Sequence, residues 1–225
     1  MSPSFRVWVR NNLFVPYKQI VASGEIRRYL ASTDEPKLNL GAGGNRLPGW
    51  LNVDLFPPPN TVYMDGARRW PFPNGTFHAL FCEHMIEHVS KTAGRHVIRE
   101  AFRTARPGGK FRVVTPDLDF FAGAVLNGAP YADGYLRFIE RFTKIEAIDW
   151  CDAINLIFYE HGHRYIYTRA ELKRELEAAG FVGMTELRAG HYDDPSFDGV
   201  DGHPALVGRE PNAIEAFAIE TRKPP

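Results

Sequence analysis

The residues best suited to chemistry begin with a glycine cluster between two apolar runs, LNLGAGGNRLPGWLNVDL at residues 38–55. Gly41, Gly43 and Gly44 allow a tight turn and let a ligand approach the backbone. Asp54 ends the second apolar run, and a carboxylate at the end of a strand can accept two hydrogen bonds from ribose hydroxyls. The segment therefore indicates a nucleoside site.

The spacing of the glycines distinguishes this segment from a dinucleotide fingerprint. The pattern GxGxxG needs a third glycine where this chain has Arg46. Only a short segment separates the turn from the second apolar run, which leaves little room for a crossover helix whose N-terminus could bind a pyrophosphate. We expect a mononucleoside ligand without phosphates, although a glycine turn alone also occurs in ordinary strand connections.

A second set of chemical residues lies in CEHMIEHV, residues 82–89. His84 to His88 match HxxEH, the inverted zinc-protease pattern, in which two histidines four residues apart on a helix bind zinc and a glutamate acts as base. That site needs a long helix and a third ligand, whereas this segment follows an apolar run and precedes Ser90, a typical helix cap. We therefore expect no metal. Glu87 suits catalysis, or a hydrogen bond that holds the loop to the next helix, equally well.

Two later segments are also rich in polar side chains. HGHRYIY (161–167) contains His161 and His163, either of which could act as a base, and Arg164, which could bind an acidic substrate. The alternative is a polar loop whose aromatic side chains pack on the next helix. HYDDPSFDGVDGH (191–203) contains aspartates and histidines without EF-hand spacing, and we interpret it as a solvated acidic loop.

The length and composition of the chain limit the kinds of protein it can be. At 225 residues the chain fits one domain with an elaboration and can bury a substantial core. Lysine plus arginine equals aspartate plus glutamate, at 27 each, which gives no reason to expect nucleic acid as a partner. Cys82 and Cys151 show no metal or redox spacing, and the interrupted apolar pattern near the N-terminus fits neither a signal sequence nor a membrane span. We expect a cytoplasmic protein.

Strands and helices alternate along the chain. Strands are expected at 37–40, 50–55, 61–64, 77–82 and 111–114, with a helix that begins after Ser90 and ends at PGG, 107–109. Such alternation predicts a parallel, doubly wound sheet. A second helix has a capping box at Thr168–Glu171 and ends at Gly180. Two further strands are expected at 181–187 and 214–221, separated by a long loop.

Two regions accompany this alternation. Residues 1–35 show a broken amphipathic pattern and are expected to form helices that cap the sheet, a lid or a membrane-surface anchor being the alternatives. The aromatic-rich stretch at about 117–166 is the natural place for a cover that encloses a substrate. The expected organisation is a helical cap (1–35) followed by one main domain (36–225) with an insertion.

The order of these motifs resembles that of class I S-adenosylmethionine-dependent methyltransferases, in particular the small bacterial type 11-like branch. The resemblance covers most of residues 37–186 and rests on four blocks: LNLGAGGNRLPGWLNVDL, YMDGARRWPFPNGTFHALFCEHMIEHV, REAFRTARPGGKFRVVTPDL and HRYIYTRAELKRELEAAGF. It implies an α/β fold with a Rossmann-like, doubly wound seven-stranded sheet, a terminal antiparallel hairpin, N-terminal helices and a helical insertion. Four ordered blocks are far more specific than any one of them.

The resemblance also implies a cofactor, S-adenosyl-L-methionine, and residues that would contact it. Asp54 would bind the ribose, Asp65 would lie near the adenine amino group, and Cys82 would border the sulfonium methyl. The full set of expected cofactor-binding residues is Leu40, Gly41, Ala42, Gly43, Asp54, Leu55, Asp65, Gly66, Cys82 and Glu83. The expected catalytic residues are Glu83, His84, His161 and His163.

Two positions depart from the family pattern. His78 stands where the family usually has aspartate, and because it lies inside an expected strand we interpret it as structural. Asn45 replaces a third glycine, which weakens only the glycine motif.

The reaction implied is transfer of a methyl group to an oxygen or nitrogen of a small molecule, such as a saccharide or a secondary metabolite. This displacement requires alignment of nucleophile, methyl carbon and sulfur, and a base where the nucleophile must lose a proton. Two alternatives use the same fold: transfer or cyclisation of the cofactor's aminobutyryl arm, and a pseudo-enzyme that only binds the cofactor. The expected partner is a small acceptor, with no nucleic acid and no membrane span, and a homodimer is left open.

Overall fold

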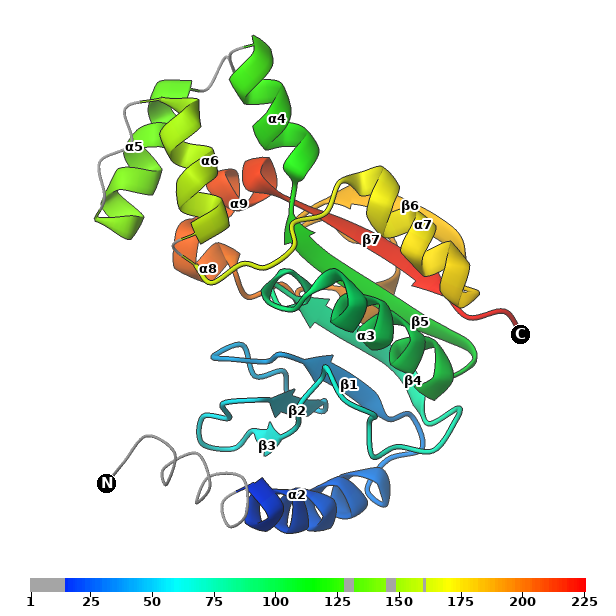
Figure 1. Ribbon diagram of the computed structural model, residues 1–225. Coiled ribbons are helices and arrows are strands. Elements are labelled where there is room, and N and C mark those ends of the chain that lie inside the picture. Colours follow the sequence, from blue (N-terminus) through cyan, green and yellow to red (C-terminus); the bar gives the residue numbers. More distant parts are fainter. Residues whose placement is uncertain (1–14, 128–131, 145–148, 160) are drawn as a thin grey trace, which may run out of the picture.

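The fold is built on a seven-stranded sheet with the order β3-β2-β1-β4-β5-β7-β6 (Figure 1). The computed structural model describes residues 15–127, 132–144, 149–159 and 161–225. The strands are β1 (Lys37–Leu40), β2 (Leu51–Asp54), β3 (Val62–Tyr63), β4 (Phe77–Glu83), β5 (Ala105–Pro116), β6 (Val182–Arg188) and β7 (Ala216–Arg222). β1 to β5 pair in parallel, and β7 runs antiparallel to β5 and β6. The expected doubly wound sheet with a terminal antiparallel pair is confirmed.

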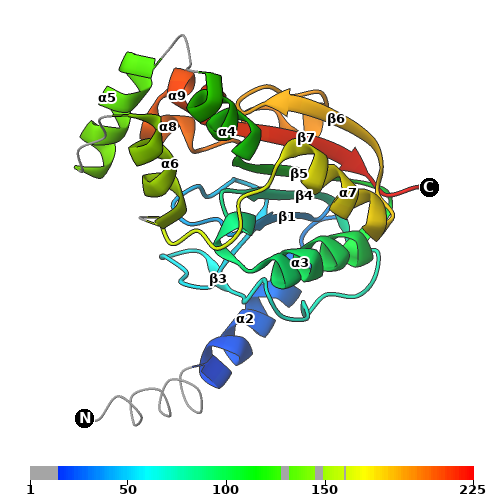
Figure 2. The same cartoon turned by 45° about the horizontal axis from the view of Figure 1, so that its top comes forward.

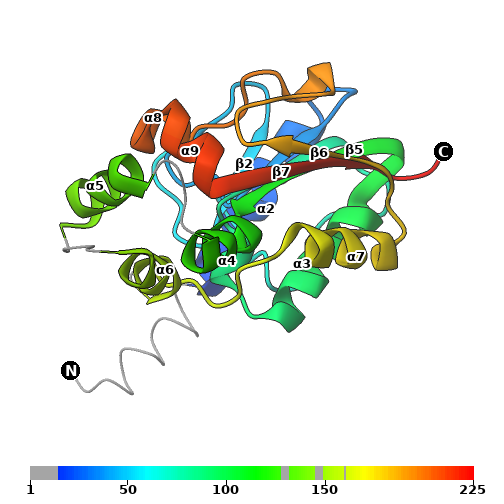
Figure 3. The same cartoon turned by 90° about the horizontal axis from the view of Figure 1, so that it is seen from above.

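The two faces of the sheet have different covers (Figure 3). Helices α3 (Lys91–Thr104) and α7 (Arg169–Ala179) lie on one face, and their apolar side chains join those of the strands in the main core. The segment 189–203, which includes the short helix η3 (Pro195–Phe197), covers the other face. Because β4 is covered on both sides, its apolar run from Phe77 to Cys82 is almost continuously buried.

The helix boundaries follow the expected capping residues. The Ser90 hydroxyl accepts a hydrogen bond from the Ala93 N–H at 3.4 Å, at the start of α3. The Thr168 hydroxyl accepts one from the Glu171 N–H at 3.1 Å, at the start of α7. Gly180 ends α7 in the left-handed conformation, with φ of 105°.

The PGG segment differs from its expected role. Helix α3 ends at Thr104, and residues 107–109 lie within β5, where the pairing with β4 shifts register between Phe77 and Ala79. A Cβ on Gly109 would lie 2.9 Å from the Phe77 carbonyl oxygen. Glycine is therefore required by close packing of two strands rather than by the end of a helix.

Among the described residues, five helices lie beyond the carboxyl ends of β4 and β5 (Figures 1 and 2). Three belong to the expected insertion: α4 (Leu118–Asn127), α5 (Ala132–Thr143) and α6 (Trp150–Tyr159). They share an aromatic core in which the Tyr135 and Trp150 rings stack with centroids 5.5 Å apart. The other two are α8 (Pro204–Val207) and α9 (Arg209–Glu215). They lie in the stretch expected to be a loop, except that Ile214 and Glu215 at the end of α9 were expected to begin the last strand.

The N-terminal region is described from residue 15 onward, so the expected helices over residues 1–14 lie outside the described residues. Helix α2 (Val15–Leu30) contributes Ala22 and Ile26 to the main core, whereas Tyr17 and Ile20 on the same helix are exposed. None of the described helices is both long enough and apolar enough to cross a membrane.

Candidate functional site

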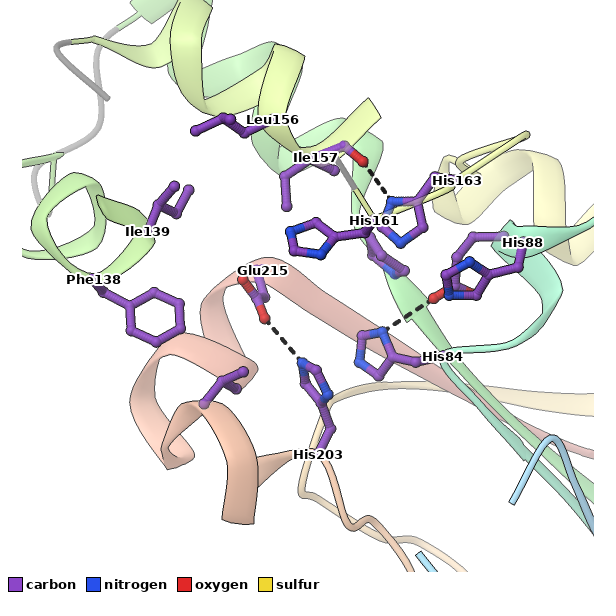
Figure 4. Close-up of a pocket in the computed structure, with 13 residues that line it drawn as sticks. His84, His88, Phe138, Ile139, Leu156, Ile157, His161, His163, His203 and Glu215 are labelled. Carbon is purple, nitrogen blue, oxygen red and sulfur yellow. Dashed lines mark hydrogen bonds and ion pairs between the residues drawn. The ribbon is translucent and has the colours of Figure 1, made fainter. Parts of the chain in front are cut away.

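In the part of the chain that the structure describes, three cavities follow the carboxyl ends of the parallel strands, and His84 lines each of them. The strand-end cavity, of about 450 Å³, lies beside β2 and β3 and includes Leu40, Asp54, Leu55, Asp65 and Gly66. The glycine-loop cavity, of about 390 Å³, includes residues 41–45, Glu83 and residues 202–203. The histidine cavity, of about 210 Å³, lies under α5 and α6 (Figure 4).

Two aspartates border the strand-end cavity, each held by backbone donors. Asp54 accepts hydrogen bonds from the Gly43 N–H at 3.0 Å and from the Phe56 N–H at 2.7 Å. Asp65 accepts one from the Ala67 N–H at 3.0 Å and another from Nε of Arg68 at 3.1 Å. A carboxylate has about four acceptor positions, so both aspartates can accept further hydrogen bonds from a ligand.

The glycine loop fits a ligand that lies against the backbone. Gly41 and Gly43 have φ of 71° and 47°, values that side-chain-bearing residues rarely adopt. A Cβ on Gly41 would lie 2.5 Å from the Met85 side chain, while Gly43 and Gly44 face open space. The residues present therefore fit the methionine part of the cofactor that the resemblance implies.

Glu83 connects the glycine loop to a distant segment. Its carboxylate accepts hydrogen bonds from the Asn45 side chain at 3.1 Å, the Gly202 N–H at 2.8 Å and the His203 N–H at 3.1 Å. Burial raises the pKa of Glu83 above its ordinary value. The backbone hydrogen bonds from Gly202 and His203 lower this pKa, but their effect is smaller. Asn45 also donates to the Val200 carbonyl at 2.8 Å, so the departure from the glycine pattern supplies a structural contact.

His84 and Glu87 form a hydrogen-bonded pair that lines the histidine cavity (Figure 4). The Nδ1 atom of His84 lies 3.1 Å from Oε1 of Glu87, whose Oε2 accepts from the Thr115 hydroxyl at 3.1 Å. Within the described residues, the buried Nε2 of His84 has no hydrogen-bond partner. Burial by itself lowers the pKa of His84, but the bond to Glu87 and the surrounding carboxylates outweigh it and raise that pKa.

A second pair, His203 and Glu215, faces the first. The Nε2 atom of His203 lies 3.3 Å from Glu215, and the Tyr135 hydroxyl donates to the other oxygen of Glu215 at 2.5 Å. Sequence reasoning missed both residues: the interpretation of 191–203 as a solvated loop is wrong for His203, and Glu215 was expected to lie in a strand. The side chain of Asp201 in that segment is fully buried and pairs with buried Arg112 at 2.6 Å. The signal was Arg112 itself, a charged residue inside an expected strand, which requires a buried partner.

His161 and His163, which were expected to be catalytic, both line the histidine cavity. The Nδ1 atom of His163 lies 2.5 Å from the Ile157 carbonyl, and burial lowers the pKa of His163 to about 4. Arg164, expected to bind an acidic substrate, is exposed and lines none of the three cavities. The backbone N–H of Arg164 donates to the backbone carbonyl of Glu87 at 2.7 Å, so Glu87 also holds the segment 161–167 in place.

The remaining expected residues divide between cavity and core. Ala42 lines the glycine-loop cavity. Cys82 is fully buried in the main core and lines none of the three cavities, and burial raises the pKa of its thiol. His78 lies in β4 beside Arg106, away from the three cavities, in line with a structural role. Residues 86–88 form a single 3-10 turn, η2 (Ile86–His88), so the helix required by the inverted zinc-protease pattern is absent from this described segment.

The chain was compared with curated proteins and with solved structures. No curated protein matches the chain. Among solved structures, a SAM-dependent methyltransferase from Archaeoglobus fulgidus is 14% identical, with a TM-score of 0.49, over 97% of this chain and 99% of that one. A phosphoethanolamine N-methyltransferase 2 from Haemonchus contortus is 12% identical, with a TM-score of 0.50, over 86% of this chain and 49% of that one.

The sequence itself matches a known family. The family described as "Methyltransferase domain" matches residues 37–186, the segment that contains the glycine loop, both strand-end aspartates, the His84–Glu87 pair and the helical insertion. Since this match covers more than half of the chain and the cavities fit the cofactor, the chain belongs to the methyltransferase-domain family and is a class I enzyme that uses S-adenosyl-L-methionine.

Proposed function

We propose that the protein transfers a methyl group to an oxygen or nitrogen of a small acceptor that binds in the histidine cavity. The observation that supports this most is the position of His84, which borders all three cavities and keeps a buried Nε2 without a partner among the described residues. A base that deprotonates the acceptor must lie where acceptor and cofactor meet.

In this proposal the cofactor is held by the strand-end and glycine-loop cavities. Bound S-adenosyl-L-methionine supplies an electrophilic methyl group on a sulfonium. Asp54 accepts hydrogen bonds from the ribose hydroxyls with the lone pairs that its two backbone donors leave, and Asp65 accepts one from the adenine amino group. Gly43 and Gly44 face open space and leave room for the methionine part beside the backbone, and Gly41 lines the same cavity.

The chain's own residues align the acceptor and remove its proton. A hydrogen bond from Nδ1 of His84 to Glu87 places the ring proton on Nδ1 and leaves the lone pair on Nε2 for the acceptor. Glu87 then stabilises the positive ring that forms. Glu83 is a positioning residue, since three donors from two segments occupy its carboxylate.

The lining of the histidine cavity favours an acceptor with both apolar and polar parts. Phe138, Ile139, Leu156, Ile157 and Val207 supply an apolar wall, and the histidines supply groups that hydrogen-bond a hydroxyl or an amine. A saccharide or a secondary metabolite with such groups remains the proposed class. The cytoplasmic location and the homodimer stay predictions.

Calorimetry tests the first step of this proposal. The purified protein is titrated with S-adenosyl-L-methionine and with S-adenosylhomocysteine, and we expect both to bind; binding of neither would overturn the proposal. Product analysis with a panel of hydroxyl and amine acceptors then separates the alternatives. S-adenosylhomocysteine is the product of methyl transfer, methylthioadenosine that of aminobutyryl chemistry, and binding without turnover indicates a pseudo-enzyme.

A further inference from the structure

Histidines are concentrated around one cavity. Five of the eight histidines in the chain line the histidine cavity, namely His84, His88, His161, His163 and His203. The proposed reaction uses His84, and His203 is paired with Glu215. The proposed base does not account for His88 and His163, whose ring centroids lie 4.8 Å apart against the buried carboxylate of Glu87.

The three side chains Glu87, His88 and His163 offer ligand atoms that all lie within 4.8 Å of one another. Nδ1 of His163 donates to the Ile157 carbonyl, so the ring proton is on Nδ1 and the lone pair of Nε2 is available to a metal. A backbone carbonyl on the other ring nitrogen is the usual orienting contact of a metal-bound histidine. Glu87 is likewise held in place, by His84 and Thr115.

Two imidazoles and one carboxylate form a ligand set typical of zinc centres that keep a fourth position open. We propose that Glu87, His88 and His163 bind a divalent transition-metal ion, with Zn²⁺ as the best match, on the wall of the histidine cavity. Imidazole ligands disfavour Ca²⁺ and Mg²⁺, which prefer oxygen. The proposal stands on these three residues and does not depend on methyl transfer.

The geometry allows the site to close around the ion. Metal–ligand bonds of about 2.0–2.1 Å in a tetrahedron place the ligand atoms about 3.4 Å from one another. In this structure the ligand atoms of the three residues lie within 4.8 Å of one another, so they must move closer together to bind the ion. Within the described part of the chain the exposed His88 ring makes no hydrogen bond or ion pair, so it can turn toward the other two ligands. This ligand set differs from the inverted zinc-protease pattern, in which His84 would be a ligand and Glu87 the base.

Titration of the full-length, untagged, EDTA-treated protein with ZnCl₂ tests the proposal. We expect one Zn²⁺ per chain, no binding of MgCl₂, and at least tenfold weaker Zn²⁺ binding in His88→Gln and in His163→Gln. The control is His191→Gln, an exposed histidine that lines none of the three cavities. Absence of Zn²⁺ binding, or equal binding by all four proteins, would overturn the site.

Two features keep this test decisive. His163 is partly buried, so a variant that fails to fold is a risk there, whereas the exposed His88 can be replaced without disturbing the core. Titration of each variant with S-adenosylhomocysteine runs in parallel. Zn²⁺ binding without S-adenosylhomocysteine binding would contradict the proposed function alone, and the reverse result would contradict the metal site alone.

Discussion

The imidazole rings of His84 and His203 lie against each other, with 3.8 Å between centroids and 33° between planes, and each ring is paired with its own glutamate. The two residues are far apart in the sequence, one after β4 and the other before α8. Glu83 connects the same two segments, because it lies next to His84 and accepts from the His203 N–H. The wall between the glycine-loop and histidine cavities is therefore formed jointly by both segments.

The first prediction concerns His84 as the base. We expect His84→Asn to lower kcat by about 10²–10⁴-fold, the usual contribution of a general base, because asparagine cannot take up the proton of the acceptor. Affinity for S-adenosylhomocysteine should change little, since the glycine loop and the strand-end aspartates remain. Steady-state kinetics with an acceptor from the product panel measures the first effect and calorimetry the second. Unchanged kcat would remove His84 from the reaction.

The second prediction concerns Asp54. Replacement by alanine should weaken S-adenosylhomocysteine binding at least tenfold, because charge-assisted hydrogen bonds of roughly 1.5–3 kcal/mol are lost. The Gly43 N–H also loses its acceptor, which loosens the glycine loop. Calorimetry measures the change, and Asp34→Ala, an exposed carboxylate before β1, is the control. Equal affinities for Asp54→Ala and the control would exclude Asp54 from the cofactor site.

The third prediction concerns the buried pair of Arg112 and Asp201. Nε and Nη2 of Arg112 donate to the two oxygens of Asp201 at 2.9 Å and 2.6 Å, and neither side chain is exposed. Asp201→Asn leaves the guanidinium with Glu220 as its only remaining carboxylate among the described residues, so we expect a loss of about 3–5 kcal/mol in the free energy of unfolding.

Urea denaturation measures this loss, and Asp198→Asn, an exposed position in the same segment, is the matched control. Because Asp201 precedes the residues that Glu83 holds, the variant should also bind S-adenosylhomocysteine more weakly. A free energy of unfolding equal to that of the control would contradict the structural role of the pair.

The sheet and the strand-end site could be predicted because their signals are local. An apolar run, a glycine cluster and Asp54 lie within eighteen consecutive residues, 38–55, and parallel strands bring their carboxyl ends to one edge. The helix caps at Ser90 and Thr168 are equally local, and both were predicted.

The His203–Glu215 pair and its position beside His84 could not be predicted in the same way. The contact between His84 and His203 depends on how the 189–203 segment folds over the sheet, and that path is fixed by Arg112, which attracts Asp201 into the core. A stretch of glycines, aspartates and histidines has the composition of a solvated loop until its buried partner is known. Long-range pairing of charges therefore determined the part of the site that the sequence did not reveal.

The last prediction concerns Glu100, which is connected to Gly66 of the strand-end cavity through hydrogen bonds of Trp70. Its carboxylate accepts from the Trp70 N–H at 2.7 Å and from Arg103 at 2.6 Å, and the Trp70 indole donates to the Gly66 carbonyl at 2.9 Å. The hydrogen bond from Arg103 is the largest cause that lowers the pKa of Glu100 below its ordinary value. A carboxyl whose folded-state pKa is lowered stabilises the protein above its unfolded-state pKa, and this contribution is lost as the pH falls through the folded-state pKa.

We therefore expect Glu100→Gln to reduce the free energy of unfolding most near pH 7 and progressively less below about pH 4, the region of the ordinary glutamate pKa. Urea denaturation of both proteins over this pH range measures the difference. Glu186→Gln is the control, because its partner Lys173 and Glu186 itself are partly exposed and such pairs contribute little. A difference between wild type and Glu100→Gln that stays constant with pH would mean that the neutral hydrogen bond to Trp70, rather than the charge beside Arg103, holds this wall of the cavity in place.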